Sequence, residues 1–121
     1  MFKASCHCGG IVLNADEAPE TITSCNCSIC HRIGALWGYY LDEQVETQQT
    51  VAIQDYRWGD KTITFHTCSG CGCTTHYTAV REDGKTKIGL NTRMVSREDT
   101  KDIRVRYFDG ADTWGFLKEE S

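Results

Sequence analysis

Three groups of cysteines are the residues of this sequence whose type and spacing could do chemistry. The eight thiols fall into the patterns Cys6-x-Cys8, Cys25-x-Cys27-x-x-Cys30 and Cys68-x-x-Cys71-x-Cys73. A C-x-x-C pair forms a tight turn whose two sulfurs converge on one ion, and two such pairs build a tetrahedral zinc site. A C-x-C pair on an extended segment can do the same, because residues i and i+2 point to one side. The spacing therefore predicts metal binding.

The simplest partition of these cysteines gives one closed zinc site and one open zinc site. Four of them would hold a structural zinc that clamps the N-terminal strand to the central hairpins: Cys6, Cys8, Cys68 and Cys71. The three of the middle group would hold a second zinc: Cys25, Cys27 and Cys30. Zinc with three protein ligands keeps a fourth position for water or substrate, as catalytic zinc does. Two zinc ions per chain are therefore expected.

The sequence leaves two alternatives to this partition. In the first, Cys73 is the fourth ligand of the second zinc, so that both sites are closed and structural. If residues 71 to 73 run extended, however, Cys73 points the same way as Cys71 and could be a spare thiol near the structural zinc or an alternative, extra ligand. In the second alternative the cysteines form disulfides, which requires an oxidising compartment. No signal peptide precedes Cys6, so a cytoplasmic protein with reduced, metal-binding thiols is favoured.

The composition favours a single domain over residues 1–121 whose core is supplemented by metal. Only 40% of the residues are hydrophobic, and small cores of this kind are commonly stapled by metals or disulfides. No apolar run approaches the length that spans a membrane. The net charge of −4 argues against nucleic acid as a partner, because nucleic-acid binding needs a basic face.

The segments between the cysteines read as short strands joined by turns. Alternating apolar residues and turn signals predict strands over Phe2–Ser5, Gly10–Asn14, Leu36–Leu41, Thr50–Arg57, Lys61–Thr67, Thr74–Arg81, Lys85–Asn91 and Ile103–Tyr107. Trp58-Gly59-Asp60 and Glu82-Asp83-Gly84 are the expected hairpin turns. One helical turn is expected over Ser28–Ile33 with Gly34 as its C-terminal stop, and Ser96 with Asp99 resembles a capping pair. The expected fold class is all-β, mainly antiparallel, built around the metal sites.

The order of the cysteine motifs resembles one known family. The supporting stretches are Cys6-His7-Cys8-Gly9-Gly10, Cys25-Asn26-Cys27-Ser28-Ile29-Cys30, Cys68-Ser69-Gly70-Cys71-Gly72, Gly89-Leu90-Asn91-Thr92 and the segment from Phe108 to Trp114. Together they resemble the glutathione-dependent formaldehyde-activating enzymes, also called the centromere-protein-V-like family, over nearly the whole chain. The resemblance implies a zinc-stapled fold of the β-tent kind. It also implies the partition given above, with the structural zinc on the four distant cysteines and the catalytic zinc on the middle three.

The activity implied by the resemblance is the condensation of formaldehyde with glutathione to S-hydroxymethylglutathione, a carbon–sulfur lyase reaction, or its reversal. A small-molecule thiol and an aldehyde would then be the partners. The sequence departs from the usual family pattern at Cys73, where a residue other than cysteine is common. The alternative function is a non-enzymatic zinc module that binds glutathione or a protein partner.

Two residues beside the middle cysteines are the catalytic candidates. Arg32 could bind a carboxylate of glutathione, since the arginine fork matches carboxylates, although a surface salt bridge is the competing role. His31 follows Cys30 directly and could donate a proton to the developing alkoxide. Arg93, after the Gly-Leu-Asn-Thr stretch, is a further candidate for the carboxylate.

Overall fold

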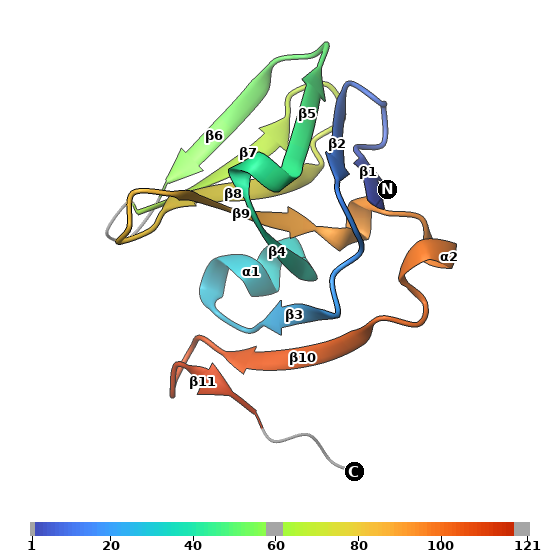
Figure 1. Ribbon diagram of the computed structural model, residues 1–121. Helices are drawn as coiled ribbons and strands as arrows, with labels where there is room; N and C mark the ends of the chain where they lie inside the picture. The colour runs from blue at the N-terminus through green and yellow to red at the C-terminus, as the bar shows by residue number, and fades with distance from the viewer. Residues whose placement is uncertain (1, 58–61, 118–121) are drawn as a thin grey trace.

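Two β-sheets share one core in the computed structural model, which describes residues 2–57 and 62–117. The small sheet consists of β1 (Phe2–Ser5), β2 (Ile11–Ala15) and β5 (Val45–Gln49), in the order β1-β2-β5. The large sheet consists of β3 (Thr21–Cys25), β4 (Trp37–Leu41), β6 (Ile53–Arg57), β7 (Ile63–Cys68), β8 (Thr74–Val80), β9 (Thr86–Asn91), β10 (Arg104–Asp109) and β11 (Gly115–Phe116). Its strand order is β11-β10-β3-β4-β9-β8-β7-β6 (Figure 1). The mainly antiparallel all-β prediction is thereby confirmed.

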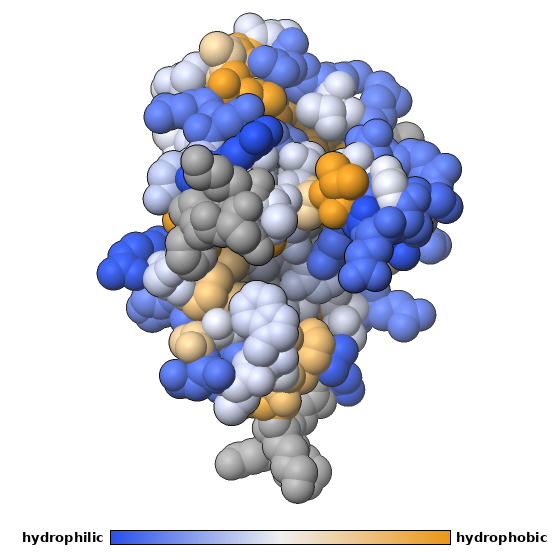
Figure 2. All heavy atoms as spheres, turned by 90° about the vertical axis from the view of Figure 1, so that its left-hand side faces the viewer, coloured by the Kyte–Doolittle hydropathy of each residue, from blue (hydrophilic) through white to orange (hydrophobic). Residues whose placement is uncertain are grey.

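The two faces of the large sheet carry different apolar clusters. Side chains alternate between the faces of a strand, so neighbouring residues serve opposite sides. One face packs against the small sheet, where Leu13 meets Tyr40 and Leu90 in the main core. The other face carries a second cluster that includes Trp37 and the thiol of Cys30. On the molecular surface shown in Figure 2, apolar residues form separate patches between hydrophilic ones. No helix within residues 2–57 and 62–117 is long and apolar enough to cross a membrane.

Local turn and helix signals are confirmed where the structure describes them. The Asp-Gly hairpin between β8 and β9 closes with Gly84 at φ 82°. Helix α1 (Ser28–Ile33) ends at Gly34, whose φ of 70° is left-handed. Helix α2 (Arg97–Thr100) begins after Ser96, whose hydroxyl accepts the Asp99 N–H. Two 3-10 turns, η1 (Asp42–Gln44) and η2 (Thr92–Met94), complete the helical elements of the described residues.

Four strands and one pairing differ from the sequence prediction. The strand expected from Thr50 begins only at Ile53, and the strands β3, β5 and β11 were not predicted. β5 is exposed over four of its five residues, so its sequence shows no alternation of apolar side chains. The series of hairpins expected along the chain also fails at β10, which pairs in parallel with β3. The predicted turn at residues 58–60 lies outside the described residues.

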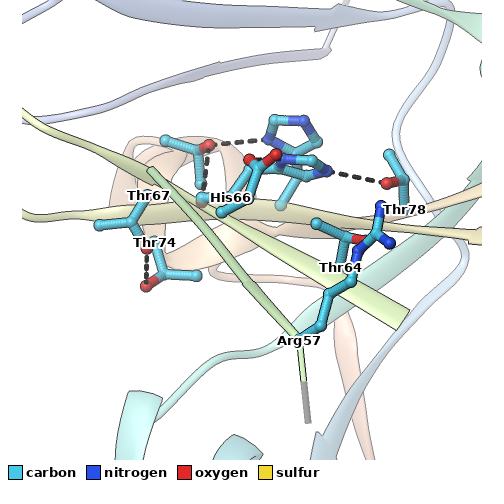
Figure 3. A network of polar contacts seen from close by, with 9 residues as sticks. Arg57, Thr64, His66, Thr67, Thr74 and Thr78 are labelled. Carbon is cyan, nitrogen blue, oxygen red and sulfur yellow. Dashed lines mark hydrogen bonds and ion pairs between the residues drawn. The ribbon is translucent and has the colours of Figure 1, made fainter. Parts of the chain in front are cut away.

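Two histidines that face each other on the adjacent strands β7 and β8 have stacked rings. The rings of His66 and His76 lie 4.5 Å apart at an interplanar angle of 24°. His66 contacts Asp55 Oδ1 through Nδ1 and Thr78 Oγ1 through Nε2, both at 2.8 Å (Figure 3). His76 is only 6% exposed and contacts the Thr75 hydroxyl at 2.8 Å. Its burial, and secondarily the charge of His66, lower the pKa of His76 to about 3.

This buried histidine is expected to make the protein less stable in acid. Between pH 6.5 and about 3 the unfolded chain protonates His76 while the folded chain does not. The free energy of unfolding should therefore decrease as the pH falls through this window, by up to about 1.4 kcal/mol per pH unit from this group. Urea unfolding of the wild type and of His76→Asn at a series of pH values measures the difference. Effects of acid on the cysteines are the same in both proteins. If the free energy of unfolding has the same pH dependence in both, the lowered pKa of His76 is contradicted.

Candidate functional site

The first cysteine group joins the small sheet to the large sheet. The sulfurs of Cys6, Cys8, Cys68 and Cys71 all lie within 4.8 Å of one another. Cys6 and Cys8 belong to the turn between β1 and β2, whereas Cys68 ends β7 and Cys71 lies in the turn that follows. The turns are closed by backbone bonds, from Gly9 N–H to the Cys6 carbonyl at 3.0 Å and from Gly72 N–H to the Cys68 carbonyl at 2.8 Å. The two turns thus bring four thiols from distant parts of the chain together.

Backbone N–H groups contact sulfurs of this first group. The Ile11 N–H donates to Cys6 Sγ at 3.3 Å. The N–H groups of Cys73 and Cys8 lower the pKa of Cys71 to about 5. The thiolate is the form that binds metal, and four converging sulfurs are the donor set of closed zinc sites. The group could therefore hold a zinc ion with no further ligand.

The second cysteine group is built where β3 runs into α1. The sulfurs of Cys25, Cys27 and Cys30 lie within 4.8 Å of one another. Cys25 ends β3, and Cys27 is the N-cap of α1, with its sulfur accepting the Cys30 N–H at 3.5 Å. The indole N–H of Trp37 donates to Cys30 Sγ at 3.3 Å. Helix α1 and the apolar cluster that contains Trp37 therefore fix the position of the Cys30 thiol.

The three thiols of this second group differ in their tendency to ionise. Burial raises the pKa of Cys30, and the neighbouring Cys27 and Cys25 thiols add to the rise although the Trp37 N–H opposes it. Burial also acts to raise the pKa of Cys27, but the Cys30 N–H and the thiols of Cys30 and Cys25 outweigh it, so the pKa is lowered. Three anionic sulfurs this close repel one another unless a cation neutralises them. The group could hold a metal ion through three ligands.

A hollow of about 180 Å³ lies beside the second group. Its walls are formed by Ser24, Cys25, Asn26, Cys30, His31, Gly34, Ala35, Leu36 and Arg93. Of the two predicted catalytic residues, His31 lines the hollow. Arg32 does not line it, and its guanidinium donates to the Ser28 carbonyl at 2.9 Å, one turn back on the same helix.

The hollow is also lined by Arg93, which the sequence favours less than Arg32, and by Asn26, which the sequence does not single out as a functional residue. Arg93 follows β9 and is anchored by a 3.2 Å bond from Nε to the Gly34 carbonyl. The pairing of Trp37 with Asn91 brings this end of β9 to the start of β4, next to α1. Asn26 also lines the hollow, and its place between two cysteines that could bind a metal is the signal available in the sequence.

Cys73 lies with the first group and not with the second. It packs against the core cluster that contains Cys6 and Cys68, and it interacts with the thiol of Cys71. Within the described residues it belongs to neither set of mutually close sulfurs. This placement agrees with the spare thiol near the first group and not with a fourth ligand for the second. All eight cysteines are free of disulfides.

Comparisons with known proteins place this architecture among solved structures and sequence families. A crystal structure of a Rhodobacter sphaeroides protein superimposes with a TM-score of 0.67 at 23% sequence identity, over 85% of this chain and 98% of that one. This likeness concerns the fold alone. No curated protein matches the chain in sequence. The family model described as glutathione-dependent formaldehyde-activating enzyme matches residues 1–108. The chain therefore belongs to the family of glutathione-dependent formaldehyde-activating enzymes.

Proposed function

We propose that the protein is a zinc-dependent enzyme of the carbon–sulfur lyase type that acts in a reducing compartment such as the cytoplasm. It would form or cleave adducts of glutathione, or a similar thiol, with formaldehyde or a related aldehyde. The observation that carries the proposal is the contrast between the two cysteine groups. One offers four converging thiols, whereas the other offers three beside a hollow of about 180 Å³. The family supplies the substrate class through its description.

The proposed reaction needs a thiolate and an activated aldehyde. In the forward direction a bond forms between the thiol sulfur and the aldehyde carbon, and the carbon–oxygen double bond becomes a single bond. The proton lost by the thiol ends on that oxygen, so no oxidant or reductant is consumed. A zinc ion bound by Cys25, Cys27 and Cys30 would supply the deprotonation of the thiol and the polarisation of the aldehyde.

The remaining residues of the hollow would bind the thiol substrate and move the proton. Arg93 is the proposed partner of a substrate carboxylate, in place of Arg32, because its side chain lines the hollow. Its positive charge also opposes the negative charge of three thiolates on one divalent cation. His31 is proposed to give the proton to the oxygen in the forward direction and to remove it in the reverse direction.

The proposal is tested by NMR exchange measurements on mixtures of formaldehyde and glutathione. Zinc-loaded protein is expected to accelerate the exchange between free and adduct forms. Cys27→Ser should remove the acceleration while the circular dichroism spectrum stays that of the wild type, because Cys27 belongs to the three-thiol group only. Cys73→Ser, which removes a thiol outside that group, should keep it. Equal exchange rates with and without wild-type protein would reject catalysis, and glutathione binding without acceleration would support the non-enzymatic zinc module instead.

A further inference from the structure

The turn that follows β10 is tied directly to the segment between Cys25 and Cys27. The parallel pairing of β10 with β3 sets Phe108 opposite Cys25. Asn26 then bonds to the turn in three ways. Its backbone N–H donates to the Phe108 carbonyl at 3.2 Å, its Nδ2 donates to Asp109 Oδ1 at 3.0 Å, and its Oδ1 accepts the Ala111 N–H at 3.0 Å. The middle residue of the Cys25-x-Cys27 motif is therefore held by a part of the chain far away in sequence.

Asp109 organises this contact from a buried position. Its side chain is 7% exposed, and its two carboxylate oxygens accept four hydrogen bonds. Besides the Asn26 amide, the donors are the Asp112 N–H at 3.2 Å, the Thr113 N–H at 3.3 Å and the Thr113 hydroxyl at 3.0 Å. A buried carboxylate is costly unless its oxygens are satisfied in this way. The carboxylate thus accepts hydrogen bonds from the turn at Asp112 and Thr113, and it also accepts one from the Asn26 side chain.

Gly110 shows how closely the turn approaches the thiols. A Cβ atom at this position would lie 2.8 Å from Cys25 Sγ and 3.2 Å from Cys27 Cβ. Only a glycine lets the backbone come so near to a sulfur. Gly110 itself does not line the hollow. A displacement of the turn would therefore be passed directly to Cys25 and Cys27.

From these contacts we infer that Asp109 is a positioning residue for a metal ion at Cys25, Cys27 and Cys30, acting through Asn26 and Gly110. Groups of this kind, behind the ligands, typically change metal affinity about 10- to 100-fold when they are lost. The inference rests on the proposed metal site and not on the proposed reaction. The four-cysteine group is built from other segments of the chain, so it provides an internal reference.

The test compares zinc affinity at both groups in Asp109→Ala, in Asp109→Asn and in Asp112→Ala. The matched control is Asp112→Ala, because Asp112 joins this network through its backbone N–H. In the wild type, chelator competition should show one zinc bound more weakly, at the three-cysteine group, and one bound more tightly, at the four-cysteine group. Asp109→Ala is expected to raise the dissociation constant of the weaker zinc about 10- to 100-fold and to leave the tighter one unchanged. Asp109→Asn should have a smaller effect, and Asp112→Ala should have none.

Cobalt substitution gives a second measurement that a merely structural role would not move. The sulfur-to-cobalt charge-transfer band of the weaker site should change in Asp109→Ala, and that of the tighter site should not. Asn26→Ala tests the same link from its other end while Asp109 keeps its bonds to Asp112 and Thr113, and it keeps the inference testable if Asp109→Ala does not fold. Equal weakening of both sites, no weakening of either, or a wild type that binds one zinc would overturn it. Selective weakening in a protein without thiol–aldehyde activity would uphold it and reject the proposed function.

Discussion

Replacing Cys68 by serine is expected to unfold the protein. The Cys68 side chain is fully buried, and its sulfur lies 3.5 Å from that of Cys8. This contact joins the end of β7 to the turn between β1 and β2, so the group connects the two sheets. Structural zinc contributes on the order of 10 kcal/mol or more in small zinc proteins, while a whole domain is stable by about 5–15 kcal/mol. Losing the fully buried Cys68 from this set of four thiols should therefore remove most of the net stability.

The measurement is circular dichroism together with zinc analysis of Cys68→Ser purified in the presence of zinc. Cys73→Ser is the matched control, because Cys73 lies beside the same group without belonging to the set of close sulfurs. It should retain the fold and both zinc ions. A Cys68→Ser protein that folds like the wild type with one zinc fewer would show that the small sheet holds to the large sheet by packing alone.

Replacing Gly89 by alanine is expected to cost about 3 kcal/mol or more, which is unusual for so small a change. A Cβ at this position would lie 2.0 Å from Cε2 of Tyr77, so the whole ring would have to move. Tyr77 faces Gly89 across β8 and β9, and its ring meets Trp37 edge-on at 4.9 Å and Phe65 at 5.7 Å. Trp37 in turn donates to Cys30 Sγ. The substitution should therefore disturb the aromatic cluster and the three-thiol group together.

Urea unfolding of the zinc-loaded protein measures this effect. Gly115→Ala is the control, because nothing lies within 4 Å of a Cβ at that strand position. It should change the free energy of unfolding by less than about 0.5 kcal/mol. In Gly89→Ala/Tyr77→Ala the collision is gone, so the double substitution should cost less than the sum of the two single ones. Strict additivity would show that the Tyr77 ring is not what the new methyl group meets.

The features that follow from neighbouring residues were predictable from the sequence. Within each motif, the C-x-C and C-x-x-C spacings indicated that the thiols converge, because each motif shapes its own turn. Gly34 after α1 and Gly84 between β8 and β9 both have the positive φ that their turn signals require. The two strands around Gly84 were placed to within one residue of their ends, since a tight hairpin fixes its own register.

The features that depend on distant pairing were not predictable. β3 has the sequence TITSC, which reads as a polar segment until β10 and β4 cover its edges. Arg93 and Asp109 reach the second cysteine group only because β9 runs beside β4 and β10 beside β3. Nearness in sequence to the three cysteines favours Arg32 over Arg93 as the partner of a substrate carboxylate. In the structure, however, the Arg32 guanidinium donates to the Ser28 carbonyl on the same helix.

Because β10 pairs with β3, the second cysteine group is contacted by residues that are synthesised much later than its own thiols. A ribosome has made every ligand of the four-cysteine group once Cys71 is synthesised. Cys25, Cys27 and Cys30 are made earlier still, yet Asp109 lies 83 positions beyond Asn26. During synthesis all four thiols of the first group are therefore present before the residue that holds Asn26 has been added. The supporting contacts of the three-thiol group are therefore complete only after β10 and the turn that follows it have been synthesised.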